Sequence, residues 1–139
     1  MNVLVDTNVW LDIILHREPH VNASAQAVAL LDQPPHRPFL VATSLTTLFY
    51  LIRRARTVEE ARRATSTLLT RVGVAPVTET ILHSALRTEL PDFEDAVLQQ
   101  AALAAGLDAV ITRNPRDFDP GVLPIYTPSE LIAALLSQQ

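Results

Sequence analysis

The sequence of 139 residues predicts a single α/β domain, in which a parallel sheet of four or five strands lies between layers of helices. Short apolar runs alternate with longer segments of helical spacing, a pattern typical of parallel βαβ units. Ten prolines and three glycines punctuate the chain near the predicted boundaries, and neither repeats nor linker-like tracts are visible. The right-handed crossover rule then favours a doubly wound sandwich.

The first elements follow from hydrophobic spacing. Residues 3–5 are a short apolar run, and helical spacing begins only after Asn8, so this run predicts a buried strand. The helix that follows is expected to end near Pro19, and helical spacing returns at 23–31. Asp12 lies within the first of these helices, and we expect its side chain to face solvent.

The middle of the chain has one further strand and two helices. The apolar run 39–42 predicts a strand, and 45–55 predicts a helix. Thr57 and Glu60 form a capping-box pattern, which predicts the start of a long helix that ends at Gly73.

The last third repeats the alternation of strand and helix. The run 74–77 predicts a third strand, and Thr78 is the expected cap of the helix after it. Asp92 and Asp95 mark the start of another helix, which ends at Gly106.

The C-terminal elements are shorter. Residues 109–111 predict a fourth strand, 114–121 a loop, and 123–126 a short fifth strand. The segment 127–130, Thr-Pro-Ser-Glu, is a strong start signal for the last helix.

Composition excludes several classes of site. Cysteine is absent, which excludes disulfides, thiolate zinc sites, iron–sulfur clusters and thiol nucleophiles. Lysine is also absent, which excludes a Walker-type phosphate loop and Schiff-base chemistry. The net charge of −4 disfavours a general nucleic-acid coat but leaves local RNA binding around a metal open. No signal peptide or membrane span is predicted, and we expect a soluble cytoplasmic protein.

Acidic residues follow the predicted strands where a doubly wound sheet places its site. Asp6 comes directly after the first strand, where it suits a helix cap and a functional carboxylate equally well. Asp92, Glu94 and Asp95 begin a later helix, where favourable interaction with the helix dipole is the simplest explanation. If Asp6 and Asp95 meet at one sheet edge, a cation must offset their repulsion. Oxygen ligands without His or Cys favour Mg²⁺ or Mn²⁺.

A third polar edge follows the fourth strand. Asn114 can offer an amide oxygen to a metal ion or to its bound water, and Asp117 is either a ligand or an ordinary turn acid. Arg113 and Arg116 either bind a phosphate or lie in a solvated loop.

Taken together, these motifs resemble PIN-domain proteins. The segments that carry the resemblance are Val-Leu-Val-Asp-Thr-Asn at 3–8, Asp-Phe-Glu-Asp-Ala at 92–96, Gly-Leu-Asp at 106–108, Ile-Thr-Arg-Asn at 111–114 and Asp-Phe at 117–118. They cover nearly the whole chain in the right order. The resemblance implies a three-layer α/β/α sandwich forming one nuclease domain over residues 1–139. It also implies a Mg²⁺- or Mn²⁺-dependent ribonuclease, of which many bacterial examples are toxins of VapBC-type toxin–antitoxin pairs.

The resemblance also implies roles for particular residues. Asp6 and Asp95 match acidic metal-binding positions, with Asp92 or Asp117 as a further ligand. Asn114 falls where many members have Asp, and Thr47 falls where Glu or another polar ligand is usual.

These two neutral residues favour one metal or weak activity. The side chains expected to orient water or substrate are Asn8, Thr47, Thr112, Asn114, Arg113 and Arg116. The partners implied are an RNA substrate, an antitoxin and a second copy of the chain, with no membrane.

Two other readings remain open. The neutral Thr47 and Asn114 are compatible with a weak or inactive PIN-like module that acts through protein partners. A phosphotransfer enzyme that uses Asp6 covalently is disfavoured by the absence of lysine.

Overall fold

The computed structural model describes residues 1–138, and Gln139 of the predicted domain 1–139 lies outside the described residues. The strands are β1 (Asn2–Val5), β2 (Arg37–Val41), β3 (Gly73–Ala75), β4 (Ala109–Ile111) and β5 (Ile125–Tyr126). The helices are α1 (Thr7–Ile14), α2 (Val21–Leu31), α3 (Ala42–Ala55), α4 (Val58–Arg71), α5 (Glu79–Leu86), α6 (Phe93–Ala104) and α7 (Pro128–Leu136), with a 3₁₀ turn η1 (Pro115–Asp117).

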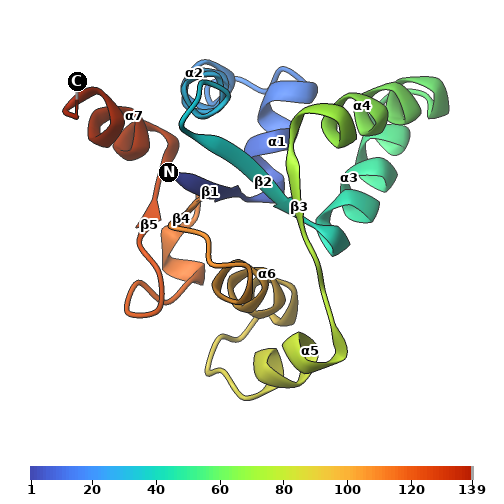
Figure 1. The fold of residues 1–139 in the computed structure, drawn as a ribbon. Coiled ribbons are helices and arrows are strands. Elements are labelled where there is room, and N and C mark those ends of the chain that lie inside the picture. Colours follow the sequence, from blue (N-terminus) through green and yellow to red (C-terminus); the bar gives the residue numbers. More distant parts are fainter. Residues whose placement is uncertain (139) are drawn as a thin grey trace.

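The five strands form one parallel sheet in the order β3-β2-β1-β4-β5. The chain builds outward from β1 to β3, then returns through α5 and α6 to place β4 on the other side of β1 (Figure 1). The predicted doubly wound α/β/α sandwich is confirmed. In such a sheet the direction of winding reverses beside β1, so β1 and β4 bound the expected site.

Helices cover both faces of the sheet, and the strands alternate between two cores. Val3 and Val5 pack with α1, α2, α3, α4 and α7 on one face, whereas Leu4 packs with α5 and α6 on the other. The same alternation holds in β4, where Ile111 joins the first core and Val110 the second. Figure 1 shows α5 and α6 together on one side of the sheet. Because both faces of the two central strands are buried, residues 3–5 of β1 and 109–111 of β4 are continuous apolar runs.

Most helix starts confirm the capping signals. Thr57 and Thr78 accept hydrogen bonds from backbone N–H groups at the starts of α4 and α5. Thr127 and Glu130 form the full reciprocal capping box of α7. Gly106 follows α6 with a φ of +70°, the left-handed conformation that favours glycine. No helix within the described residues is both long and apolar enough to span a bilayer.

Candidate metal and RNA site

Asp6 lies at the switch between β1 and β4. Its backbone N–H donates to the carbonyl of Ile111 at 2.9 Å, which extends the pairing of the two strands. Its Oδ1 accepts from the Thr7 N–H at 2.7 Å, and its Oδ2 accepts from the Thr112 hydroxyl, also at 2.7 Å. The residue therefore caps α1 and still faces the sheet edge, so both readings of Asp6 describe the same side chain.

The environment of Asp6 disfavours a bare negative charge. Asp6 is only 7% exposed, and burial raises the pKa of its carboxyl above the ordinary value. The hydrogen bonds from Thr112 and Thr7 lower that pKa in part, while the charges of Glu94 and Asp117 raise it again. Binding of a cation would therefore stabilise this buried carboxylate and offset the repulsion from its acidic neighbours.

The start of α6 brings the second group of acids to the same place. Asp92 caps the helix, with Oδ1 accepting from the Asp95 N–H at 3.0 Å. Asp95 is half-buried, and burial raises its pKa to about 7, with further raising contributions from the charges of Asp92, Asp6, Asp117 and Glu94. Helix capping therefore accounts for an acid at Asp92. Stabilisation by the helix dipole does not account for Asp95, because a favourable dipole would lower the pKa of its carboxyl.

These residues line one open pocket of about 370 Å³. Its lining consists of Asp6, Thr7, Asn8, Leu11, Arg17, Thr47, Asp92, Glu94, Asp95, Arg113, Asn114 and Asp117. Eight of the predicted site residues are thus brought together, although they come from β1, α1, α3, α6 and the loop after β4.

Two predicted residues lie outside that lining. Thr112 is fully buried behind Asp6, where its hydroxyl also accepts from the Asn114 N–H at 3.0 Å. Arg116 borders an adjoining hollow that is lined by residues 113–117. Arg116 therefore does not contact the acidic pocket itself, whereas Arg113 borders both hollows.

The neutral residues of the pocket have few internal partners. Thr47 donates to the Thr43 carbonyl of its own helix at 3.4 Å, the long limit of a hydrogen bond. The Asn8 side-chain oxygen accepts from the Arg113 N–H at 3.3 Å and so connects α1 to the loop after β4. These amide and hydroxyl groups line the pocket without adding negative charge.

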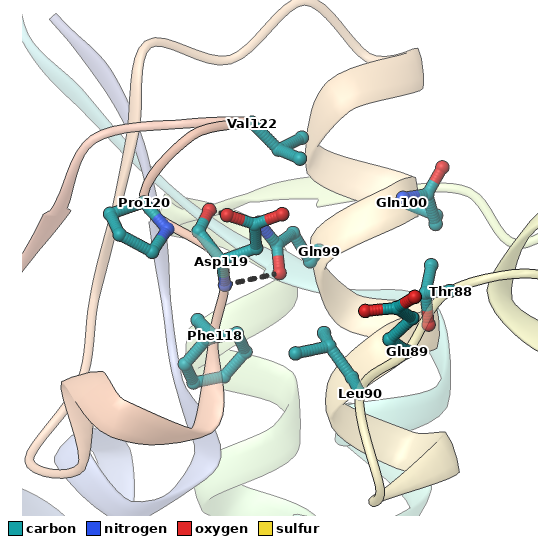
Figure 2. Close-up of a pocket in the computed structure, with 9 residues that line it drawn as sticks. All are labelled: Thr88, Glu89, Leu90, Gln99, Gln100, Phe118, Asp119, Pro120 and Val122. Carbon is teal, nitrogen blue, oxygen red and sulfur yellow. Dashed lines mark hydrogen bonds between the residues drawn. The ribbon is translucent and has the colours of Figure 1, made fainter.

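A buried amide on α6 fixes the loop that follows Asp117. Gln99, one turn beyond Asp95, donates to the Asp119 carbonyl at 2.6 Å and accepts from the Asp119 N–H at 3.0 Å. Figure 2 shows this pair beside a second pocket between α6 and the loop, which is lined by Gln99, Phe118 and Leu90 among others. Gln99 thus pairs with both backbone groups of Asp119, as a residue of a neighbouring strand would. These bonds fix the loop that carries Asp117 to the helix that carries Asp95. The sequence analysis missed Gln99, since a glutamine within a helix has no distinguishing signal.

One sequence prediction in this region is wrong. Asp12 was expected to face solvent, but it is fully buried. Arg17 Nε donates to its Oδ1 at 3.1 Å, Arg113 Nε lies 2.7 Å from its Oδ2, and the Ser24 hydroxyl donates to Oδ2 at 3.3 Å. Two guanidinium groups thus compensate a charge that could not otherwise be buried. Arg17 and Glu94 are also pocket residues that the sequence analysis did not assign to the site.

The donor set fits a hard divalent cation in its chemistry. Carboxylate, amide and hydroxyl oxygens converge without imidazole or thiolate groups, which is the ligand preference of Mg²⁺ or Mn²⁺. Burial is the main reason why the pKa of Asp6 and of Asp95 is raised, and the charges of neighbouring acids raise both further, so a bound cation would stabilise the ionised carboxylates. Within residues 1–138, however, no three acidic or histidine side chains are drawn together closely enough to form a preassembled metal cluster.

Comparison with protein families and solved structures identifies similar molecules. The family model described as "PIN domain" matches residues 2–116. A search of curated protein sequences found no match.

Several solved structures share the fold. VapBC-1 from nontypeable Haemophilus influenzae superposes with a TM-score of 0.70 at 19% identity, over 90% or more of both chains (93% of this chain and 99% of the other). A toxin–antitoxin complex from Klebsiella pneumoniae gives 0.69 at 24% identity, with coverage of 91% and 97%. Mycobacterium tuberculosis VapC20, described as a sarcin-ricin loop cleaving toxin, gives 0.64 at 21% identity, with coverage of 78% and 86%.

Proposed function

This chain belongs to the PIN-domain family, and from that membership and its acidic pocket we propose that it is a metal-dependent endoribonuclease. The observation that carries the proposal is that Asp6 and Asp95 line one pocket at the switch of the sheet, where burial and the charges of neighbouring acids raise the pKa of both. We treat residues 1–139 as one nuclease domain, because β5 and α7 beyond the matched segment complete the same sheet and core.

Asp6 and Asp95 would hold Mg²⁺ or Mn²⁺, with Asp92 or Asp117 as a further ligand. When bound, the ion would polarise the scissile phosphodiester and lower the pKa of an attacking water. Thr112 fixes the orientation of Asp6 by donating to Oδ2. Gln99 fixes the loop that carries Asp117 against the helix that carries Asp95.

The other pocket residues would act on water and substrate. Asn114 and Thr47 line the pocket with neutral oxygens and would orient water, while Asn8 and Arg113 of the same lining would contact the RNA strand. Arg116, in the adjoining hollow, would contact a phosphate farther along the strand. With neutral groups at Thr47 and Asn114, we propose that the site holds one ion before substrate binds and that its activity is weak.

The Asp6→Asn variant tests the nuclease assignment. Asparagine can still accept from the Thr7 N–H, so the helix cap and the fold should survive. Outer-shell changes at metal sites cost about 10–100-fold, so loss of a direct ligand should lower Mn²⁺-dependent RNA cleavage by at least about a hundredfold. The control is Asp32→Asn, an acid in an exposed ion pair with Arg71. Undiminished cleavage by a folded Asp6→Asn protein would refute the assignment.

A toxin of a VapBC-type pair is the biological setting that we propose. The similar structures include toxin–antitoxin complexes, one of them from Rickettsia felis bound to a promoter DNA fragment. On this chain, α1, α3 and α4 enclose an apolar groove of about 400 Å³, lined by Ile13, Ile14 and Ile52. Trp10 also lines the groove, and its indole N–H is buried without a hydrogen-bond partner among the described residues. Arg56 and Arg63 line the same groove.

This groove suits an amphipathic acidic segment of an antitoxin. Apolar side chains would cover the isoleucines, and carboxylates would pair with the exposed arginines. Co-expression with the neighbouring upstream reading frame should yield a complex that reversing the charge of Arg56 and Arg63 weakens. The homodimer stays a prediction, which light scattering of the purified chain would measure.

The rival function is a PIN-like module that binds partners without cleaving RNA. It is favoured by the neutral Thr47 and Asn114 and by the lack of a preassembled carboxylate cluster among residues 1–138. Calorimetric titration with Mn²⁺ separates the two. Binding at millimolar or tighter affinity supports the nuclease, whereas no binding and no cleavage of several RNAs supports the module.

A further inference from the structure

The cations in the acidic pocket share one buried partner. Arg17 and Arg113 are the arginines among its lining residues, and both contact Asp12. Arg17 Nε and Nη2 each lie 3.1 Å from Asp12 Oδ1, and Arg113 Nε lies 2.7 Å from Oδ2, in an ion pair whose N–H is not aligned for a hydrogen bond. The carboxylate of Asp12 therefore holds both guanidinium groups in place.

The carboxylates of the pocket create a difficulty for an RNA substrate. Five acids line the pocket, so the phosphates of an approaching strand are repelled by the groups that would bind the metal. Phosphate oxygens need fixed donors of positive charge, and the planar guanidinium supplies them with defined geometry. Two such groups side by side would repel each other, but Asp12 between them offsets that repulsion.

The two arginines are also exposed enough to bind a ligand. The Arg17 side chain is 39% exposed and that of Arg113 is 26% exposed, although the carboxylate between them is fully buried. Arg113 borders the acidic pocket, the hollow at 113–117 and a third pocket of about 450 Å³ beside His20 and Ser129. A strand that crosses from one hollow to the next must pass this guanidinium.

Stability alone is a weak reason for this arrangement. Replacing a buried ion pair by apolar residues is often neutral or stabilising, because desolvation costs as much as the attraction returns. We propose that Asp12 is a positioning residue, which holds Arg17 and Arg113 as a clamp for the phosphates of single-stranded RNA beside the acidic pocket. The inference rests on the proposed RNA substrate but concerns binding, which is measured without metal or cleavage.

The decisive experiment is the affinity of Asp12→Asn for RNA. The probe is a fluorescein-labelled single-stranded RNA in EDTA, with binding followed by fluorescence anisotropy. Simple electrostatics predicts tighter binding when a negative charge is removed, whereas loss of a clamp predicts weaker binding. We expect at least about a tenfold loss, the size of one lost charge-assisted hydrogen bond. Equal or tighter binding by the folded variant overturns the proposal.

Salt dependence provides a readout that a purely structural role would not change. Arg17→Ala and Arg113→Ala should each weaken binding and flatten the slope of log affinity against log salt by about 0.7, the value for one phosphate contact on a single strand. The matched control is Arg71→Ala, which removes an arginine that pairs with Asp32, outside the lining of the acidic pocket. An unchanged slope in both pocket variants contradicts the clamp.

A second variant covers the case in which Asp12→Asn does not fold. Replacing Arg17 and Arg113 by lysine retains both charges but removes the Nε groups that contact Asp12. We expect about a tenfold loss of RNA affinity, and unchanged affinity overturns the proposal. The nuclease assignment is judged separately, by cleavage in Asp6→Asn. Binding without cleavage leaves the clamp standing, and cleavage without dependence on Asp12 leaves the nuclease standing.

Discussion

Two carboxylates, Asp6 at the N-terminal cap of α1 and Asp12 within that helix, have opposite surroundings. Both are nearly or fully inaccessible to solvent. Asp6 receives two hydrogen bonds but has acids as its charged neighbours, and its pKa is raised. Asp12 lies between Arg17 and Arg113 and also accepts from Ser24.

This difference teaches that a buried carboxylate can serve two purposes: Asp6 is suited to bind a cation, whereas Asp12 already pairs with cations of the protein. A buried carboxylate without a cation is maintained at a cost, and a metal ion that binds there recovers the free energy. A buried carboxylate between two guanidinium groups is already compensated, so removing it leaves two positive charges without a counter-ion. Neutral substitutions among the acids of the pocket and at Asp12 should therefore have effects of opposite sign on the free energy of unfolding in the absence of metal.

The largest expected effect on stability is that of Asp12→Ala. It leaves two guanidinium groups close together without their shared counter-ion. We expect the free energy of unfolding to fall by about 3 kcal/mol, the low end for a broken buried pair, because both arginines can partly turn to solvent. Urea unfolding measures it. Asp32→Ala, from the exposed pair with Arg71, should cost less than about 1 kcal/mol. Similar losses in the two variants would erase the distinction.

A smaller effect is expected for a substitution of Thr112, whose hydroxyl donates to the Asp6 carboxylate. Thr112→Val preserves shape but removes the donor to Asp6 Oδ2 and the acceptor for the Asn114 N–H. Stability should fall by about 1–2 kcal/mol, and Mn²⁺ affinity by about tenfold or more. Thr65→Val, which removes a hydroxyl bonded within its own helix, is the control. Unchanged Mn²⁺ affinity in Thr112→Val would show that the hydroxyl does not support a metal ligand.

The third expected effect is a pH dependence from Asp95, which screening by solvent reduces because the side chain is only half-buried. Its pKa is about 7 in the folded protein and 3.8 as the ordinary value, so between these limits the folded state binds more protons than the unfolded state. In EDTA, stability contributed at this site should fall as pH rises from about 4 to about 7 and then level off. Thermal melts of Asp95→Asn should show higher stability than the wild type at pH 8 and no gain near pH 4. A gain that grows toward acid would contradict the sign.

Much of this architecture was predictable because it rests on local rules. Hydrophobic spacing and caps such as Thr78 and Thr127 located the elements, since a cap acts within one helical turn. The rule that sites lie at the strand ends of a doubly wound sheet directed attention to Asp6, and Asp95 was its candidate partner at the start of a later helix, which the family resemblance reinforced. The Asp12 prediction failed because Arg113, about a hundred residues away in sequence, is one of its compensating charges.

The sequence by itself determined which segments are strands and helices, the oxygen-rich chemistry available to the site and the absence of lysine and cysteine alternatives. Only the tertiary structure decided which charges are buried together. Helix spacing is a property of neighbouring residues, but the free energy of a buried charge depends on every group around it, however distant along the chain. Asp6 and Asp12 are the same residue type, six positions apart. The folded chain places acids beside Asp6 and two arginines beside Asp12.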